Sequence, residues 1–140
     1  MADNRTVEQR SYNMSMIRST NTKPEILVRK FLFKQGFRYR LHSKKLVGKP
    51  DIVMPKYNTV IFVHGCFWHG HSNCKLAKVP VSNNSFWVDK IETNKKRDKR
   101  NVAKLKKHGW KVFVLWECQL AKNKVENTLN KLLKKLLMED

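Results

Sequence analysis

The feature that most limits how this chain can fold is an apolar run that breaks into metal-binding residue types. Residues 60–63 read Val-Ile-Phe-Val, the pattern of a buried strand. Residues 64–74 follow directly and contain three of the five histidines and two of the three cysteines. Rigid scaffolds often present reactive groups at the ends of strands. We therefore expect the functional chemistry to be concentrated just past the end of this strand.

The charge of the chain predicts a polyanionic partner. Lys and Arg number 30 against 11 Asp and Glu, and the formal net charge of +19 is spread along the sequence. A folded basic domain of this kind indicates nucleic-acid binding, with ribosome association or a basic surface without a specific task as alternatives. The 140 residues, 41% of them hydrophobic, fit one compact domain. The sequence has no long apolar run and no apolar signal-peptide core, which predicts a cytoplasmic protein without a membrane segment.

Helical patterns lie on both sides of the apolar run. Thr22-Lys23-Pro24-Glu25 predicts a helix start with Thr22 as N-cap, and the helix continues to about Gln35. A long basic helix is predicted from about residue 86 to 108, and an amphipathic helix over 125–137. Residues 1–20 are consistent with a weakly amphipathic helix or with a frayed terminus.

Strand patterns occupy the region between these helices. Residues 37–41 alternate apolar and basic side chains, and residues 110–116 form a strongly apolar run. Residues 52–54 and 59–63 are short apolar runs separated by a turn, which predicts a hairpin. The hairpin would carry Asp51 near the start of one strand and His64 at the end of the next.

Asp51 is the only carboxylate between Glu25 and Asp89. In a basic segment, a carboxylate opposes phosphate binding unless a cation lies between them, and Mg²⁺ is the usual cation. The simpler alternative is that Asp51 caps a turn or pairs with Lys49. Capping alone explains Glu25 adequately, and the residues by themselves favour that role over catalysis.

The cysteines have a spacing typical of a structural zinc site. Two cysteines and a histidine lie on one short loop, and the remaining cysteine follows the 110–116 strand, which completes a tetrahedral set: Cys66, His71, Cys74 and Cys118. Zinc bound there would close the 64–80 loop onto the sheet. Spacing alone does not decide between His69 and His71 as the nitrogen ligand, and buried or incidental thiols are the alternative.

Three motifs together resemble those of the very short patch repair (Vsr) DNA mismatch endonucleases. They are Gly-Lys-Pro-Asp at 48–51, His-Gly-Cys-Phe-Trp-His at 64–69 and Leu-Trp-Glu-Cys at 115–118, and the likeness covers nearly the whole chain. The resemblance implies an α/β, restriction-endonuclease-like fold: a mixed central sheet flanked by helices, with a structural zinc loop. It implies a single domain over residues 1–140, in which residues 1–20 contact DNA. It also implies a Mg²⁺-dependent enzyme that nicks one strand 5′ to the thymine of a T:G mismatch left by deamination of 5-methylcytosine.

The resemblance further implies a role for individual residues of these motifs. Asp51 and the backbone carbonyl of Val63 would bind Mg²⁺, and His69 would be the general base. His64 would support the metal–phosphate network, and Glu25 would act through metal-bound water. Val63 stands where threonine is common in the family.

The same resemblance assigns the zinc ligands and the DNA wedge. Zinc would be bound by His71 rather than His69, together with the three cysteines. The side chains that intercalate beside the mismatch would be Phe67, Trp68, Trp87 and Met14.

Double-stranded DNA with a T:G mismatch would be the substrate of such a protein. Mismatch-repair proteins and a repair polymerase are expected partners, and a monomer at the bacterial nucleoid is the expected state. Two other hypotheses stay open: a restriction-like nuclease of different specificity, and a zinc-containing DNA-binding protein without turnover.

Overall fold

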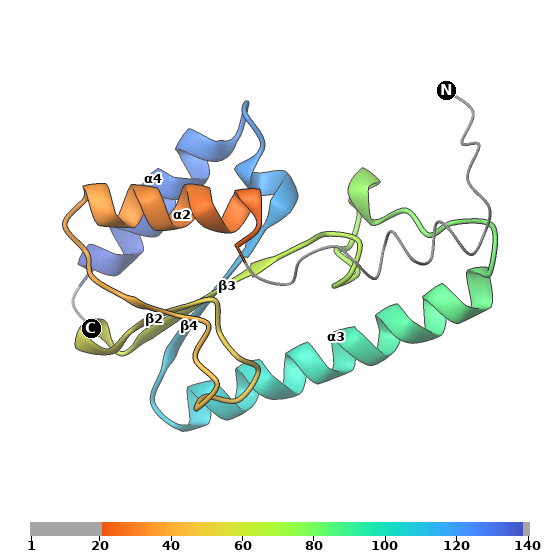
Figure 1. The fold of residues 1–140 in the computed structure, drawn as a ribbon, viewed down its shortest axis with the longest axis horizontal. Coiled ribbons are helices and arrows are strands. Elements are labelled where there is room, and N and C mark those ends of the chain that lie inside the picture. The colour runs from red at the N-terminus through yellow and green to blue at the C-terminus, as the bar shows by residue number, and fades with distance from the viewer. Residues whose placement is uncertain (1–20, 139–140) are drawn as a thin grey trace.

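The computed structural model describes residues 21–138, so the N-terminal segment 1–20, including Met14, lies outside the described residues. The described part of the chain has a four-stranded mixed sheet in the order β1-β2-β3-β4 and three α-helices (Figure 1). The strands are β1 (Arg40–Leu41), β2 (Ile52–Met54), β3 (Thr59–His64) and β4 (Lys111–Trp116). The helices are α2 (Lys23–Lys34), α3 (Asn84–Lys107) and α4 (Val125–Leu137). The expectation of a mixed α/β fold is confirmed.

The sheet brings the ends of two strands to one edge. β2 and β3 form the predicted antiparallel hairpin, in which Ile52 pairs with Ile61. β3 and β4 are parallel, and His64 pairs with Trp116. The segments that leave these two strands therefore start side by side, although they are about fifty residues apart in the sequence.

The strand predicted over residues 37–41 is wrong in its extent. Only Arg40 and Leu41 pair with β2, opposite Val53 and Ile52. β2 ends at Met54 because Pro55 begins a short 3-10 turn and has no N–H to donate. Residues 37–38 therefore have no strand opposite them.

Helix α2 starts where the capping pattern predicts. The N–H of Glu25 donates to the Thr22 hydroxyl at 3.4 Å, and Pro24 lies in the first turn. The Glu25 carboxylate accepts the N–H of Asn21 at 3.3 Å, one residue before the N-cap. Capping therefore uses part of the hydrogen-bonding capacity of Glu25 and leaves the rest for other partners.

Helices cover both faces of the sheet, with α2 and α4 on one side and α3 on the other (Figure 1). The larger core cluster joins Val28 and Leu32 of α2, and three leucines of α4, to Ile61 and Leu115 of the sheet. The smaller cluster places Leu105 of α3 against the opposite face, and its buried members are Val53, Val60, Phe62 and Leu105. This two-sided burial explains why the central strand β3 is apolar at nearly every position rather than alternating.

No helix within residues 21–138 is long and apolar enough to cross a membrane.

Candidate functional site

Among residues 21–138, three groups of potential metal ligands adjoin β3 or the loop that follows it. In each group, the ligand atoms lie within 4.8 Å of one another. We call them the cysteine cluster (Cys66, His71, Cys74 and Cys118), the histidine cluster (His64, His69 and Asp98) and the carboxylate cluster (Glu25, His42 and Asp51).

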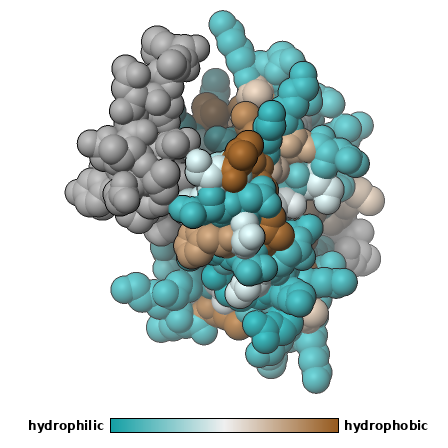
Figure 2. All heavy atoms as spheres, turned by 90° about the vertical axis from the view of Figure 1, so that its right-hand side faces the viewer, coloured by the Kyte–Doolittle hydropathy of each residue, from teal (hydrophilic) through white to brown (hydrophobic). Residues whose placement is uncertain are grey.

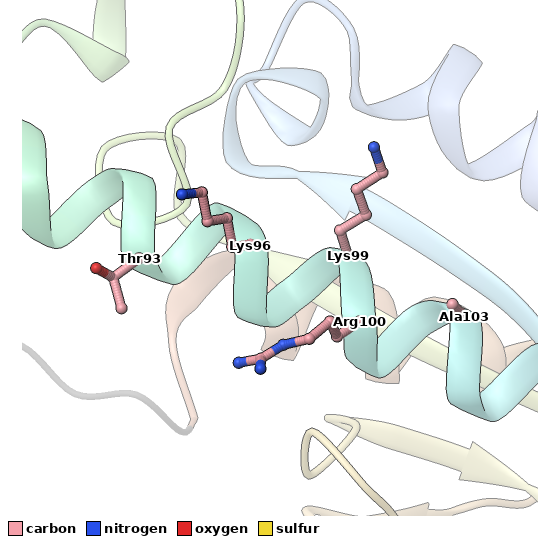
Figure 3. A pocket seen from close by; sticks show the side chains of 5 residues that line it. All are labelled: Thr93, Lys96, Lys99, Arg100 and Ala103. Atoms are coloured by element: carbon pink, nitrogen blue, oxygen red, sulfur yellow. The ribbon is translucent and has the colours of Figure 1, made fainter.

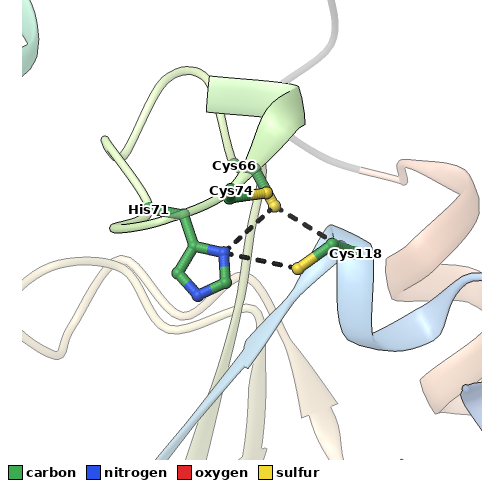
Figure 4. A group of neighbouring side chains, drawn as sticks. All are labelled: Cys66, His71, Cys74 and Cys118. Carbon is green, nitrogen blue, oxygen red and sulfur yellow. Dashed lines mark hydrogen bonds between the residues drawn. The ribbon is translucent and has the colours of Figure 1, made fainter. Parts of the chain in front are cut away.

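The cysteine cluster closes the loop after β3 onto the end of β4 (Figure 4). The Nδ1 of His71 lies 3.6 Å from the sulfur of Cys66 and 3.3 Å from that of Cys118. The His71 ring stacks on Trp116 with 4.1 Å between ring centroids, which holds the imidazole in place. Three sulfurs and one nitrogen that converge in this way fit a tetrahedral metal ion.

Burial makes a bare thiolate unfavourable at Cys66 of the cysteine cluster. Cys66 is fully buried, and desolvation raises the pKa of its thiol to about 12. The N–H of Cys118 donates to the Cys66 sulfur at 3.4 Å and offsets only part of this penalty. A bound cation would supply the missing compensation.

Gly70 separates the two histidines whose roles the spacing left open. It has φ +60°, and a Cβ atom built there would lie 2.6 Å from Cγ2 of Ile91 and 2.8 Å from Cδ of Lys95. Only glycine therefore allows the loop to turn this closely against α3. The turn directs His71 to the cysteines, while His69 faces Asp98 of α3.

His69 and Asp98 form a close pair within the histidine cluster. The Nδ1 of His69 lies 2.5 Å from Oδ2 of Asp98. Burial alone would raise the pKa of Asp98, but the hydrogen bond and charge of His69 hold it below its usual value. An ionised Asp98 accepts the Nδ1 proton of His69, which leaves Nε2 as a proton acceptor.

His64 packs against this pair as a neutral ring. Its imidazole stacks on that of His69 with 3.8 Å between centroids and 4° between planes. Burial, together with the adjacent His69, lowers the pKa of His64 to about 4. The Nδ1 of His64 is buried and has no hydrogen-bond partner in the described part of the chain.

Asp51 is tied to β3 in the carboxylate cluster. Its Oδ2 accepts the N–H of Val63 at 2.7 Å. The pKa of the Asp51 carboxyl is raised to about 6, mainly by burial and also by the nearby Glu25, while the Val63 hydrogen bond and His42 oppose this rise. The negative charge of Asp51 thus lacks full compensation, as expected for a carboxylate that binds a cation.

Glu25 lies beside Asp51 and is 1% exposed. Its Oε2 is 2.7 Å from Nη1 of Arg29, and both of its oxygens are 2.9 Å from Nε2 of His42. The structure therefore combines a capping position at the start of α2 with a place in the carboxylate cluster.

The predicted aromatic wedge forms one packed group next to these clusters. The rings of Phe67, Trp68 and Trp87 meet edge to face, with centroids 5.3 to 5.7 Å apart. Phe67 and Trp68 are half-buried, whereas Trp87 is only 7% exposed and lies beneath them. The side-chain amide of Asn94 donates to the Trp68 carbonyl at 2.9 Å, which anchors the wedge to α3.

The surface around the start of α3 is mostly hydrophilic, with small separate hydrophobic areas (Figure 2). A groove of about 590 Å³ runs along α3, lined among the described residues by Thr93, Lys96, Lys99, Arg100 and Ala103 (Figure 3). Lys96 and Asp98 are two residues apart and so point about 200° apart around the helix. The groove therefore lies on the side of α3 opposite Asp98, and none of the cluster residues lines it.

Two residues of these clusters were not identified from the sequence. Asp98 is one acid within a long charged helix, and His42 lies in a segment predicted only as a loop. The helical period places Asp98 on the same face as the buried Trp87, Ile91 and Leu105, and this signal could have identified it. No local pattern distinguishes His42, since its partners come from residues 25 and 51.

Comparison with known proteins defines the class of this molecule. The family model for DNA mismatch endonuclease Vsr matches residues 2–76. The chain is 54% identical over 138 residues to the Type II nicking enzyme V.NmeAIP of Neisseria meningitidis serogroup A, covering 97% of both proteins. It is 42% identical over 120 residues to the DNA mismatch endonuclease Vsr of Escherichia coli, covering 86% of this chain and 76% of that protein.

A further relative is the Type II nicking enzyme V.XorIIP of Xanthomonas oryzae pv. oryzae, 49% identical over 121 residues, 86% of this chain and 88% of that one. The fold, the clusters and these matches define an endonuclease that acts on DNA. The chain belongs to the Vsr family, as its motifs indicated.

Proposed function

We propose that this chain is a Mg²⁺-dependent endonuclease that nicks DNA 5′ to the thymine of a T:G mismatch and so initiates very short patch repair of deaminated 5-methylcytosine. One observation carries the proposal: a continuous set of contacts runs from Asp51 through Val63 and His64 to His69 and Asp98. Asp51, which would bind the cation, and His69, which would accept the proton, are thus both held beside the end of β3. The similarity to mismatch and nicking endonucleases supports this assignment.

Asp51 and the carbonyl of Val63 would hold the Mg²⁺. Both offer the oxygen atoms that this ion prefers, and the raised pKa of Asp51 fits a carboxylate with an uncompensated charge. When bound, Mg²⁺ supplies Lewis-acid stabilisation of charge on the phosphate. A backbone carbonyl serves this purpose equally from valine or threonine. Glu25 would hydrogen-bond the water molecules of the ion.

His69 acts as the general base in this proposal. Its Nδ1–H donates to Asp98, so Nε2 accepts the proton of the attacking water. Water attacks phosphorus, the bond to the 3′ oxygen breaks, and the cut strand carries a 5′-phosphate. Asp98 stabilises the imidazolium that forms, and the stacked, neutral His64 keeps the ring plane of His69 fixed.

The cysteine cluster would bind a structural Zn²⁺. Four protein ligands leave no open position for a water molecule, so the ion would stabilise the loop rather than take part in the reaction. This loop carries His69, Phe67 and Trp68, and its position depends on the cluster. The mixed sheet with helices on both faces is consistent with a restriction-endonuclease-like fold in one domain.

The aromatic wedge would provide mismatch recognition. Phe67 and Trp68 would enter the base stack with Trp87 packed behind them, while Met14 in the DNA-contacting segment 1–20 approaches from the opposite groove. Apolar wedges unstack a base step at a cost of a few kcal/mol, and a mismatched step opens more easily than a matched one. The protein would act as a monomer. After it nicks the strand, repair proteins and a polymerase would replace the DNA next to the nick.

The Asp51→Ala variant tests this proposal most simply. Nicking of a T:G duplex in Mg²⁺ should be lost, whereas binding to the same duplex in a gel-shift assay should be retained. Nicking at the wild-type rate would exclude Asp51 from catalysis. A wild-type protein that binds DNA without cutting it in any divalent cation would indicate a binding protein without turnover.

A further inference from the structure

We propose that His42 supplies an imidazole nitrogen to the cation site formed by Asp51 and Glu25, so that this site binds Mn²⁺ and related transition ions more tightly than Mg²⁺. The inference rests on the proposed function in one respect, namely that Asp51 binds the catalytic cation. It adds a ligand of a different chemical type and a preference among divalent ions. It also places Glu25 in direct contact with the transition ion, where the proposed function has a water molecule between Glu25 and Mg²⁺.

The geometry of the carboxylate cluster is that of a chelating group. The Nε2 of His42 lies 2.9 Å from each oxygen of Glu25, and one oxygen of Asp51 completes a set within 4.8 Å. Neighbouring ligands on an octahedral ion with bonds of about 2.1 Å lie about 3 Å apart. Only small movements would be needed for the three side chains to share one ion.

The backbone fixes His42 beside Asp51. The His42 N–H donates to the Asp51 carbonyl at 3.0 Å, which extends the ladder between β1 and β2 by one bond. His42 also has φ +48°, a left-handed conformation that L-residues adopt infrequently. The side chain of His42 is 24% exposed, so an ion from solvent can reach it, while Glu25 forms the buried floor of the cluster.

Charge in the cluster favours a cation near Asp51. Arg29, with its Nη1 2.7 Å from Oε2 of Glu25, offsets the charge of Glu25. Asp51 is held by the Val63 N–H, which is a dipole rather than a charge. A cation bound between the two carboxylates would relieve their repulsion in a poorly hydrated space.

The nitrogen ligand determines which cation fits best. Mg²⁺ prefers oxygen ligands and loses its waters reluctantly, whereas first-row transition ions also accept imidazole. A site of two carboxylates and one imidazole therefore favours the transition ion. The histidine cluster does not offer such a site, because the nearly parallel rings of His64 and His69 cannot direct their in-plane lone pairs at one ion.

The test measures cation binding on the full-length protein without DNA, with one equivalent of Zn²⁺ present to fill the cysteine cluster. Mn²⁺ binding is followed by electron paramagnetic resonance, Mg²⁺ binding by competition, and nitrogen ligation by electron spin-echo modulation of the bound Mn²⁺. The variant is His42→Gln, whose amide N–H can still donate to Glu25. The matched control is His108→Gln, at the exposed end of α3.

Wild type and the control should bind Mn²⁺ about tenfold or more tightly than Mg²⁺ and show the nitrogen coupling. His42→Gln should lose the coupling, and its preference for Mn²⁺ should fall several-fold. Coupling that persists in His42→Gln, or equal affinities of wild type for the two ions, would overturn the inference.

Two further measurements keep the test decisive. If His42→Gln has a clearly lower melting temperature than wild type, His42→Asn replaces it. In addition, absence of nitrogen coupling in the wild-type protein refutes the inference without any variant. Nicking of a T:G duplex in Mg²⁺ is measured in parallel. Nicking without nitrogen coupling would support the proposed function and refute the inference about His42. Nitrogen coupling without nicking would support the inference about His42 and refute the proposed function.

Discussion

The Nδ1 of His69 lies 2.5 Å from Oδ2 of Asp98, and this contact joins the loop after β3 to the middle of α3. It determines which nitrogen of His69 carries the proton and which is free to accept one. The neighbouring His71, two residues along, faces the cysteine cluster instead. Two histidines separated by one glycine in the same loop thus contact two different groups of ligands.

The Asp98→Asn variant should lower the nicking rate about 10²- to 10⁴-fold, because an amide stabilises the imidazolium of His69 less than a carboxylate does. Single-turnover nicking of a T:G duplex measures this effect. Asp89→Asn, an exposed acid on the same helix, is the control and should leave the rate unchanged. Equal rates for Asp98→Asn and wild type would remove Asp98 from the mechanism.

The two histidines should separate in a pair of variants. His71→Asn should lower the bound Zn²⁺ to well below one equivalent and lower the melting temperature, because the cysteine cluster loses its nitrogen ligand. His69→Asn should keep its Zn²⁺ and its stability but lose nicking. Metal analysis, thermal melting and the nicking assay on both variants test whether His71 is the zinc ligand and His69 the general base. Loss of Zn²⁺ from His69→Asn would contradict this division of roles.

Gly70→Ala should destabilise the protein by about 1–3 kcal/mol, because the new Cβ would clash with Ile91 as well as adopt an unfavourable φ. Gly36→Ala separates these two causes. Gly36 also has a positive φ, +93°, but has nothing within 4 Å of a Cβ. Chemical denaturation should show a larger loss for Gly70→Ala, and equal losses would mean that the contact with α3 is relieved without cost.

Trp68→Ala should reduce the preference for a T:G over a T:A duplex more than it reduces overall DNA binding, because the wedge would lose one of its two half-buried aromatic rings. Phe33→Ala is the control, since Phe33 is a 56% exposed aromatic on α2. The ratio of nicking rates on the two duplexes is the quantity to compare. An unchanged ratio for Trp68→Ala would show that selectivity resides elsewhere.

Local patterns in the sequence predicted the elements of the fold well. Thr22 and Pro24 marked the start of α2, and the apolar runs at 52–54 and 59–63 became the hairpin of β2 and β3. The strand at 37–41 was predicted too long, because its alternation continues past the point where Pro55 ends the partner strand. The presence of a pairing partner is a property of the tertiary structure.

The candidate site was predictable where its residues are close in the sequence. His64, His69 and the loop cysteines stood out by density, whereas Asp98 and His42 act through contacts 29 and 17 residues away. Spacing also left His69 and His71 as equally good candidates for the nitrogen ligand of the zinc site. Their different orientations depend on the close approach of Gly70 to Ile91, which no local pattern shows.

The most direct test of this account is strand-resolved cleavage of duplexes that differ only in one T:G or T:A pair, across several flanking sequences, in Mg²⁺ or EDTA. The account predicts a nick confined to the thymine strand of the T:G duplex, 5′ to the mismatched thymine, that requires Mg²⁺. Equal cutting of the T:A duplex would contradict mismatch specificity and favour a restriction-like enzyme. Cutting that persists in EDTA would contradict the role of the cation at Asp51.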